Sequence, residues 1–122
     1  MSPEGMAVIL KRFESPDEVR TFARGRFELV RIGALTVGRA TYEPGWKWST
    51  DVGPGVGATR CSVGHVGLVL SGTGTVGFDD GTVIELREGY LFSIPATPHD
   101  SWVLGDKPYV SLHFVGADHY AK

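Results

Sequence analysis

The chain has 122 residues and a formal net charge of -2 at pH 7, with 42% hydrophobic and 21% charged residues. This length favours one domain with a single core, and the ordinary composition excludes disordered and fibrous proteins. Without a basic excess the surface cannot neutralise a run of phosphates, so we expect no nucleic-acid partner. No apolar stretch approaches the ~20 residues of a membrane helix, and the N-terminus lacks a secretory leader. We therefore expect no membrane partner and a cytoplasmic protein.

The N-terminal segment, residues 6–24, predicts a strand followed by a brief helical turn. Met6 to Phe13 form a short apolar run that is typical of a strand. Ser15 offers a helix N-cap, Pro16 suits the first helical position, and two acidic residues follow it. We expect the helical turn to end at about Ala23.

From Phe27 onward every periodic segment is strand-like. The chain has 17 glycines, about twice the usual share, and they stand singly between apolar runs, as turns between short strands do. The Asp80-Gly81 pair predicts a tight hairpin. Residues 48–60 hold three glycines and one proline and predict the one long loop. The predicted strands cover residues 27–32, 34–42, 62–71, 73–79, 83–87, 90–94, 101–104 and 109–115.

Eight short strands on a chain of this length indicate an all-β sandwich or barrel with antiparallel strands. The pattern of strands and turns does not choose between these two architectures.

Several motifs in the second part of the chain narrow the choice. His65 to Gly72 read His-Val-Gly-Leu-Val-Leu-Ser-Gly and precede the predicted hairpin; Gly89 to Ile94 lead into Pro95-Ala96-Thr97-Pro98-His99. Over roughly the last two-thirds of the chain, this combination resembles the cupin superfamily. The resemblance implies a small single-domain cupin over residues 1–122, a double-sheet jelly-roll β-barrel whose barrel spans residues 26–116.

The resemblance also implies a metal site. In cupins a first motif supplies two histidines and a glutamate, and a second motif supplies another histidine. Counting back from Gly72 puts His65 at the glutamate position, and Cys61 and Thr59 at the two histidine positions. His99 occupies the position of the second-motif histidine. Cys61, His65 and His99 are therefore the predicted metal ligands.

The spacing of the first two ligands suits this prediction. Thr59, Cys61 and His65 are an even number of residues apart, so their side chains share one face if the segment is a continuous strand. A thiolate and two imidazoles suit a divalent metal ion, with zinc as the first choice and iron, nickel or copper as alternatives. Three protein ligands leave a position for water or substrate. The simpler alternatives are that Cys61 is a buried hydrophobe and His65 a hydrogen-bonded interior histidine.

Four further residues are predicted to bind a small molecule inside the barrel: Trp48, Asp100, Trp102 and His113. Trp48 and Trp102, with Trp46 and Tyr42, form an aromatic set that suits an apolar cavity, although core packing also explains it. Asp100 follows His99 and could orient it or serve as a turn residue. His113 points inward if its neighbours in the last strand pack outside, which makes it a candidate fourth ligand or acid-base group.

Three functions remain open at this stage. The first is a small cupin barrel that binds a divalent metal and a small molecule, and the sequence does not decide whether it is an enzyme. The second is a metal-free module that binds or senses a small molecule, and the third is a scaffold whose barrel is filled by side chains. We also expect a homodimer, because Val66, Leu68 and Leu70 offer apolar area on an outer sheet face.

Overall fold

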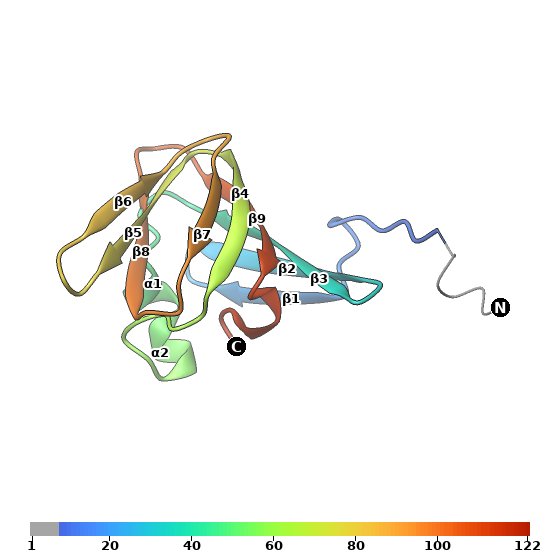
Figure 1. Ribbon diagram of the computed structural model, residues 1–122, viewed down its shortest axis with the longest axis horizontal. Coiled ribbons are helices and arrows are strands. Elements are labelled where there is room, and N and C mark those ends of the chain that lie inside the picture. The colour runs from blue at the N-terminus through green and yellow to red at the C-terminus, as the bar shows by residue number, and fades with distance from the viewer. Residues whose placement is uncertain (1–7) are drawn as a thin grey trace.

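A computed structural model describes residues 8–122 as two antiparallel sheets that pack face to face (Figure 1). The six-stranded sheet has the order β1-β2-β3-β9-β4-β7, and the three-stranded sheet has the order β6-β5-β8. The predicted all-β fold is confirmed. The strands are β1 (Glu18–Phe22), β2 (Gly25–Ile32), β3 (Leu35–Tyr42), β4 (His65–Ser71), β5 (Thr73–Phe78), β6 (Val83–Leu86), β7 (Leu91–Ile94), β8 (His99–Leu104) and β9 (Tyr109–Val115).

The core lies between the two sheets, and alternation along each strand decides which side chains enter it. In β9, Tyr109, Ser111 and His113 are buried, while Val110 and Leu112 face outward and are only partly covered. Strands of both sheets contribute apolar side chains to the core. Members of this core include Phe27, Leu29, Ala40, Tyr42, Trp46, Val69, Val76, Phe92, Ile94 and Val103.

The predicted hairpin is present between β5 and β6. The Gly81 N–H donates to the Phe78 carbonyl at 3.0 Å, and Gly81 adopts a φ of 92°. A residue with a Cβ is strained in that region of backbone space, so the glycine supplies what the turn requires.

The N-terminal predictions are wrong over the described residues. Residues 8–13 form no strand, and the first residues of that predicted strand, Met6 and Ala7, lie outside the described range. The predicted helix is absent because β1 forms there and pairs antiparallel with β2. The Asp17 carboxylate accepts a hydrogen bond from the Arg31 backbone N–H at 2.7 Å, so it fixes the strand pair instead of an N-terminal helical turn.

The predicted long loop contains two short helices, α1 (Trp48–Asp51) and α2 (Gly53–Val56). A one-turn 3-10 helix, η2 (Ala117–His119), follows β9 near the C-terminus. Within the described residues, no helix combines the length and the hydrophobicity that crossing a bilayer requires.

Candidate metal centre and barrel cavity

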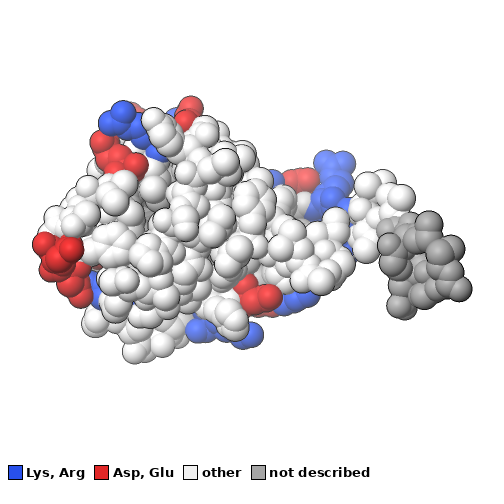
Figure 2. Space-filling model, viewed as in Figure 1, with Lys and Arg blue, Asp and Glu red and all other residues white. Residues whose placement is uncertain are grey.

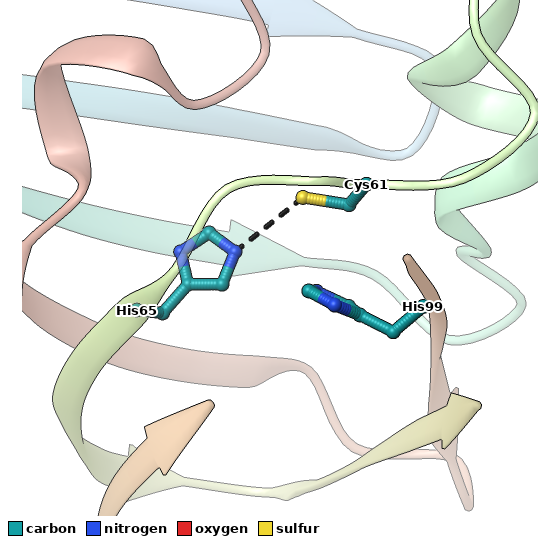
Figure 3. Close-up of side chains that lie close together, drawn as sticks. All are labelled: Cys61, His65 and His99. Carbon is teal, nitrogen blue, oxygen red and sulfur yellow. Dashed lines mark hydrogen bonds between the residues drawn. The ribbon is translucent and has the colours of Figure 1, made fainter. Parts of the chain in front are cut away.

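Cys61, His65 and His99 converge inside the barrel (Figure 3). Each offers one ligand atom, and these three atoms lie within 4.8 Å of one another. The Cys61 Sγ is 3.4 Å from the His65 Nε2. All three residues are buried, with at most 4% of their surface exposed. Of the described residues, this is the one group of three or more cysteine, histidine or acidic side chains that could hold a metal ion.

A backbone bridge, rather than a continuous strand, brings the three side chains together. Cys61 pairs with His99, with N–O distances of 2.8 and 3.0 Å, and this pair ties the loop after α2 to the start of β8. Residues 62–64 are irregular and β4 begins only at His65, so the strand predicted over residues 62–71 starts three residues later and the segment from Thr59 to His65 is not one continuous strand. Thr59 is exposed and takes no part in the cluster.

A hydrogen bond at Nδ1 fixes the tautomer of the His99 imidazole. The His99 Nδ1 lies 2.8 Å from the Thr97 carbonyl oxygen, which can only accept a hydrogen bond. Nδ1 therefore carries the proton, and Nε2 keeps its lone pair. A hydrogen bond of this kind orients metal-binding histidines in proteins generally.

Burial keeps both histidines of the cluster neutral. It lowers the pKa of His65 to about 4, with a smaller contribution from His99, and it also lowers the pKa of His99. Burial raises the pKa of the Cys61 thiol to about 11. At neutral pH the cluster thus holds two imidazoles with free lone pairs and one thiol that must lose its proton to bind a metal. This donor set fits a soft or borderline divalent ion such as zinc.

A cavity of about 40 Å³ lies beside the cluster and has room for a few water-sized groups. None of its described lining residues is a lysine, arginine, aspartate or glutamate. The aromatic and histidine side chains of the lining are Tyr42, Trp46, His65, Phe92, His99, Trp102, Tyr109, His113 and Tyr120.

Several polar atoms in this lining have no hydrogen-bond partner among the described residues. They are buried nitrogen and oxygen atoms, namely Trp46 Nε1, His65 Nδ1, Thr75 Oγ1 and His113 Nδ1. A buried polar atom without a partner costs about 1–3 kcal/mol, and most such atoms in proteins bind water or a ligand. The cavity therefore offers unused donors and acceptors to a small polar guest.

The four predicted small-molecule residues fall into two pairs. Trp102 and His113 line the cavity, and the His113 ring lies 5.3 Å from the ring of His65 between centroids. His113 is not part of the three-residue ligand group. Trp48 and Asp100 do not line the cavity.

Both of the residues outside the cavity have contacts at α1. Trp48 is buried as the first residue of α1. The Asp100 carboxylate accepts hydrogen bonds from the Ser49 backbone N–H at 3.0 Å and from the Ser49 hydroxyl at 2.7 Å, so it joins β8 to α1. Its hydrogen-bond partners among the described residues are those of Ser49 and the Ser101 backbone N–H, and none joins it to His99.

The sequence interpretation did not include Tyr109, Thr75 and Tyr120, which also line the cavity. Tyr109 could have been found, because it shares the inward face of β9 with His113. Thr75 gave no comparable signal, since a threonine in a strand is ordinary. Tyr120 follows the last strand, where no periodicity indicates an inward side chain.

No protein-family model matches the chain, and no curated protein sequence matches it. Several solved structures do match the chain. A protein of unknown function from Rhizobium leguminosarum superposes with a TM-score of 0.57 at 16% identity, and the match covers 88% of this chain and 97% of that one. A cupin domain from Bordetella pertussis gives a TM-score of 0.53 at 14% identity, over 75% of this chain and 91% of that one.

A larger protein is also similar. The oxalate decarboxylase of Lactobacillus farciminis, solved as a formate complex, gives a TM-score of 0.57 at 14% identity. The match covers 81% of this chain but only 30% of that one, so the chain spans less than a third of that enzyme. At these identities the likeness concerns the fold.

Proposed function

Because the chain has the cupin fold, as its structural neighbours do, we propose that it binds a divalent metal ion through Cys61, His65 and His99 and holds a small molecule in the adjoining cavity. The observation that carries the proposal is the convergence of one sulfur and two imidazole nitrogens within 4.8 Å in a buried pocket. Because the sequence identity to these solved structures is low, their likeness to this chain does not identify the ligand or the reaction.

The protonation and orientation of the two histidines support the proposal that a metal binds here. Both imidazoles are neutral because burial lowers their pKa values, and the Thr97 carbonyl orients His99. Zinc is the ion we favour, since it accepts sulfur and nitrogen ligands together. Held by Cys61, His65 and His99, a zinc ion would supply Lewis acidity to a water or substrate.

The cavity limits the small molecule. Its volume of about 40 Å³ suits a molecule of few non-hydrogen atoms. Its unpartnered atoms, such as Trp46 Nε1 and Thr75 Oγ1, favour a guest that both accepts and donates hydrogen bonds. His113 and Trp102 are the lining residues we expect to contact it.

Metal analysis of untagged protein tests the metal proposal. We expect about one metal ion per chain in the wild type and loss of that metal in a Cys61→Ala/His65→Ala variant, because removal of two ligands leaves only His99. A His119→Ala variant is the matched control, since this exposed histidine lies outside the cluster, and it should keep its metal. Substoichiometric metal in the wild type, purified without chelators, would contradict the proposal.

The unpartnered cavity atoms also favour a second candidate, a metal-free module that binds or senses a small molecule. The two candidate functions differ in whether binding of the small molecule requires the Cys61, His65 and His99 side chains. Thermal stabilisation by small polar compounds should disappear in Cys61→Ala and His99→Ala variants if the metal holds the compound. Stabilisation that persists in both variants would favour the metal-free module.

A further inference from the structure

The C-terminal residues 117–122, which we call the strap, place Tyr120 in the wall of the barrel cavity. Tyr120 follows η2 and is only 3% exposed, whereas His119 and Lys122 of the same segment are exposed. The Tyr120 ring lies 4.8 Å from the ring of Phe27 and 5.3 Å from that of His65, measured between centroids, and it lines the cavity. This one side chain therefore separates the cavity from the exposed end of the chain.

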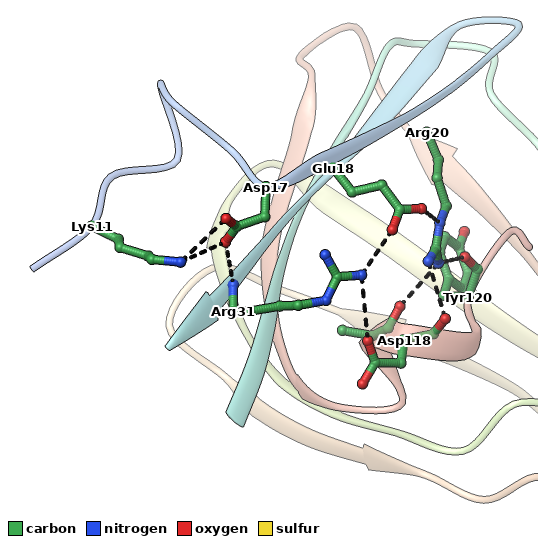
Figure 4. A network of polar contacts seen from close by, with 8 residues as sticks. Lys11, Asp17, Glu18, Arg20, Arg31, Asp118 and Tyr120 are labelled. Carbon is green, nitrogen blue, oxygen red and sulfur yellow. Dashed lines mark hydrogen bonds and ion pairs between the residues drawn. The ribbon is translucent and has the colours of Figure 1, made fainter. Parts of the chain in front are cut away.

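One arginine of β1 holds the strap in place (Figure 4). The Arg20 guanidinium donates to three strap carbonyls, those of Ala117 at 3.2 Å, Asp118 at 3.1 Å and Tyr120 at 2.6 Å. The Glu18 carboxylate accepts a hydrogen bond from the Arg20 Nε at 2.7 Å and fixes the guanidinium in its position. The Arg20 side chain is only 9% exposed, so these charge-assisted bonds are largely shielded from water.

Besides Arg20, the strap has two side-chain anchors. On the outside, the Arg31 Nη2 lies 4.0 Å from the Asp118 carboxylate (Figure 4). Inside the barrel, the Tyr120 hydroxyl lies 2.6 Å from the Tyr42 hydroxyl. The strap's own backbone hydrogen bonds are local, from His119 to Gly116 and from Tyr120 to Ala117. Across residues 8–122, no backbone hydrogen bond ties the strap to a strand. The sheets around the cavity are held by continuous ladders, so we expect the strap to open at a lower free-energy cost than the sheets.

Gly116 marks the place where the strap can bend. It has a φ of 88°, and an added Cβ would collide with the Gly64 carbonyl oxygen. The chain therefore leaves β9 through a glycine that packs directly against the loop before β4. Only residues beyond this point must move to uncover the cavity.

We propose that the strap is a gate to the barrel cavity and that Arg20 is its latch. In the structure, the guanidinium holds the strap backbone and the Tyr120 ring forms part of the cavity wall. When the strap swings away at Gly116, Tyr120 leaves the barrel and the cavity and the Cys61–His65–His99 cluster meet solvent. This gate concerns access, so it stands whether or not a metal binds.

The rate at which Cys61, the sole cysteine, is chemically modified measures how readily the strap opens. Cys61 is buried within the cluster, and its reaction with a disulfide reagent such as dithiobis-nitrobenzoate requires that the reagent reach it. In metal-free protein at fixed pH, we expect Arg20→Met to raise the rate of thiol modification by about tenfold or more, because charge-assisted hydrogen bonds to the strap are lost. Arg26→Met, which removes an ion pair to Glu28 on the large sheet, is the matched control and should leave the rate near that of the wild type.

Two further measurements separate gating from unfolding. The thiol rate should depend only weakly on low urea concentrations, because opening the strap exposes little surface, whereas global unfolding gives a steep dependence. An Arg20→Lys variant, which keeps the charge but has fewer donors, should show an intermediate rate. A rate in Arg20→Met that equals the control, or that follows global unfolding in urea, would overturn the proposal.

Discussion

Burial governs the charge of the histidines that face the cavity. It lowers the pKa of His113 to about 3, with a smaller contribution from His65, and that of His65 to about 4. No acidic side chain among the described residues lines the cavity, so nothing there compensates an imidazolium. These histidines are thus poor proton acceptors in the folded protein, and their free lone pairs favour a role as ligands or hydrogen-bonding groups.

Acid should destabilise the protein through these histidines. In the unfolded chain a histidine takes up a proton near its ordinary pKa of 6.5, whereas folded His113 does so only at about 3. The free energy of unfolding should therefore fall as pH drops below 6.5, by up to about 1.4 kcal/mol per pH unit for each such histidine. Urea unfolding of metal-free protein between neutral and mildly acidic pH measures this slope.

A His113→Gln variant isolates one histidine of the pair. We expect its pH slope to be smaller than that of the wild type by the share of one histidine, even if the variant is less stable at neutral pH. His119→Gln, which changes an exposed histidine, is the control and should keep the wild-type slope. An unchanged slope in His113→Gln would show that this residue does not stay neutral in the folded state.

Among the elements, each strand from β2 to β9 overlaps a segment that the sequence predicts as a strand. The prediction fails at β1, because Pro16 and Asp17 look like a helix start when considered alone. Their role is decided by β2, whose Arg31 backbone N–H binds Asp17 across the sheet. Such a partner 14 residues away lies outside any local pattern.

At the candidate site, too, the sequence predicts what local spacing determines and misses contacts between residues far apart in the chain. Motif spacing selected Cys61, His65 and His99, and the inward position of His113 followed from its place in the last strand. Spacing could not show that Asp100 turns toward α1. It also could not show the backbone bridge from Cys61 to His99, because that bridge depends on how β8 meets the loop after α2.

Close approach of β4 and β9 depends on Gly67. A Cβ at this position would collide with the Leu112 carbonyl oxygen and with the Phe92 ring. We expect Gly67→Ala to destabilise the protein by about 1–3 kcal/mol, because one of these groups must move. Chemical denaturation measures the change. Gly55→Ala is the control, since nothing lies within 4 Å of a Cβ there, and equal stability of the two variants would contradict the packing argument.

At the scale of the whole molecule, the outer face of β4, β7 and β9 is apolar. Exposed side chains on these strands include Val66 at 37%, Leu70 at 47%, Leu91 at 73% and Val115 at 56% of their surface. Figure 2 shows charged side chains mainly at the periphery of this view, with an uncharged region over these strands. An apolar sheet face of this kind is typical of a protein interface, and we propose that a second copy of the chain covers it.

Light scattering across a range of protein concentrations tests the homodimer. We expect the wild type to be a dimer and Leu70→Lys to weaken the dimer by at least about tenfold, because a lysine would be buried in the interface. Val83→Lys is the matched control, since Val83 is 57% exposed on β6 of the smaller sheet, and it should remain a dimer. A wild-type monomer at every concentration would exclude this interface.

The aromatic wall of the cavity has an optical consequence. The rings of Tyr42 and Trp46 stack face to face with centroids 3.8 Å apart and planes inclined by 4°, and both line the cavity. Rigidly packed aromatic rings in a chiral setting produce near-ultraviolet circular dichroism, which is lost when tertiary packing loosens. The barrel thus carries an intrinsic chromophore pair in the wall of its cavity, and changes in that wall can be followed without a label.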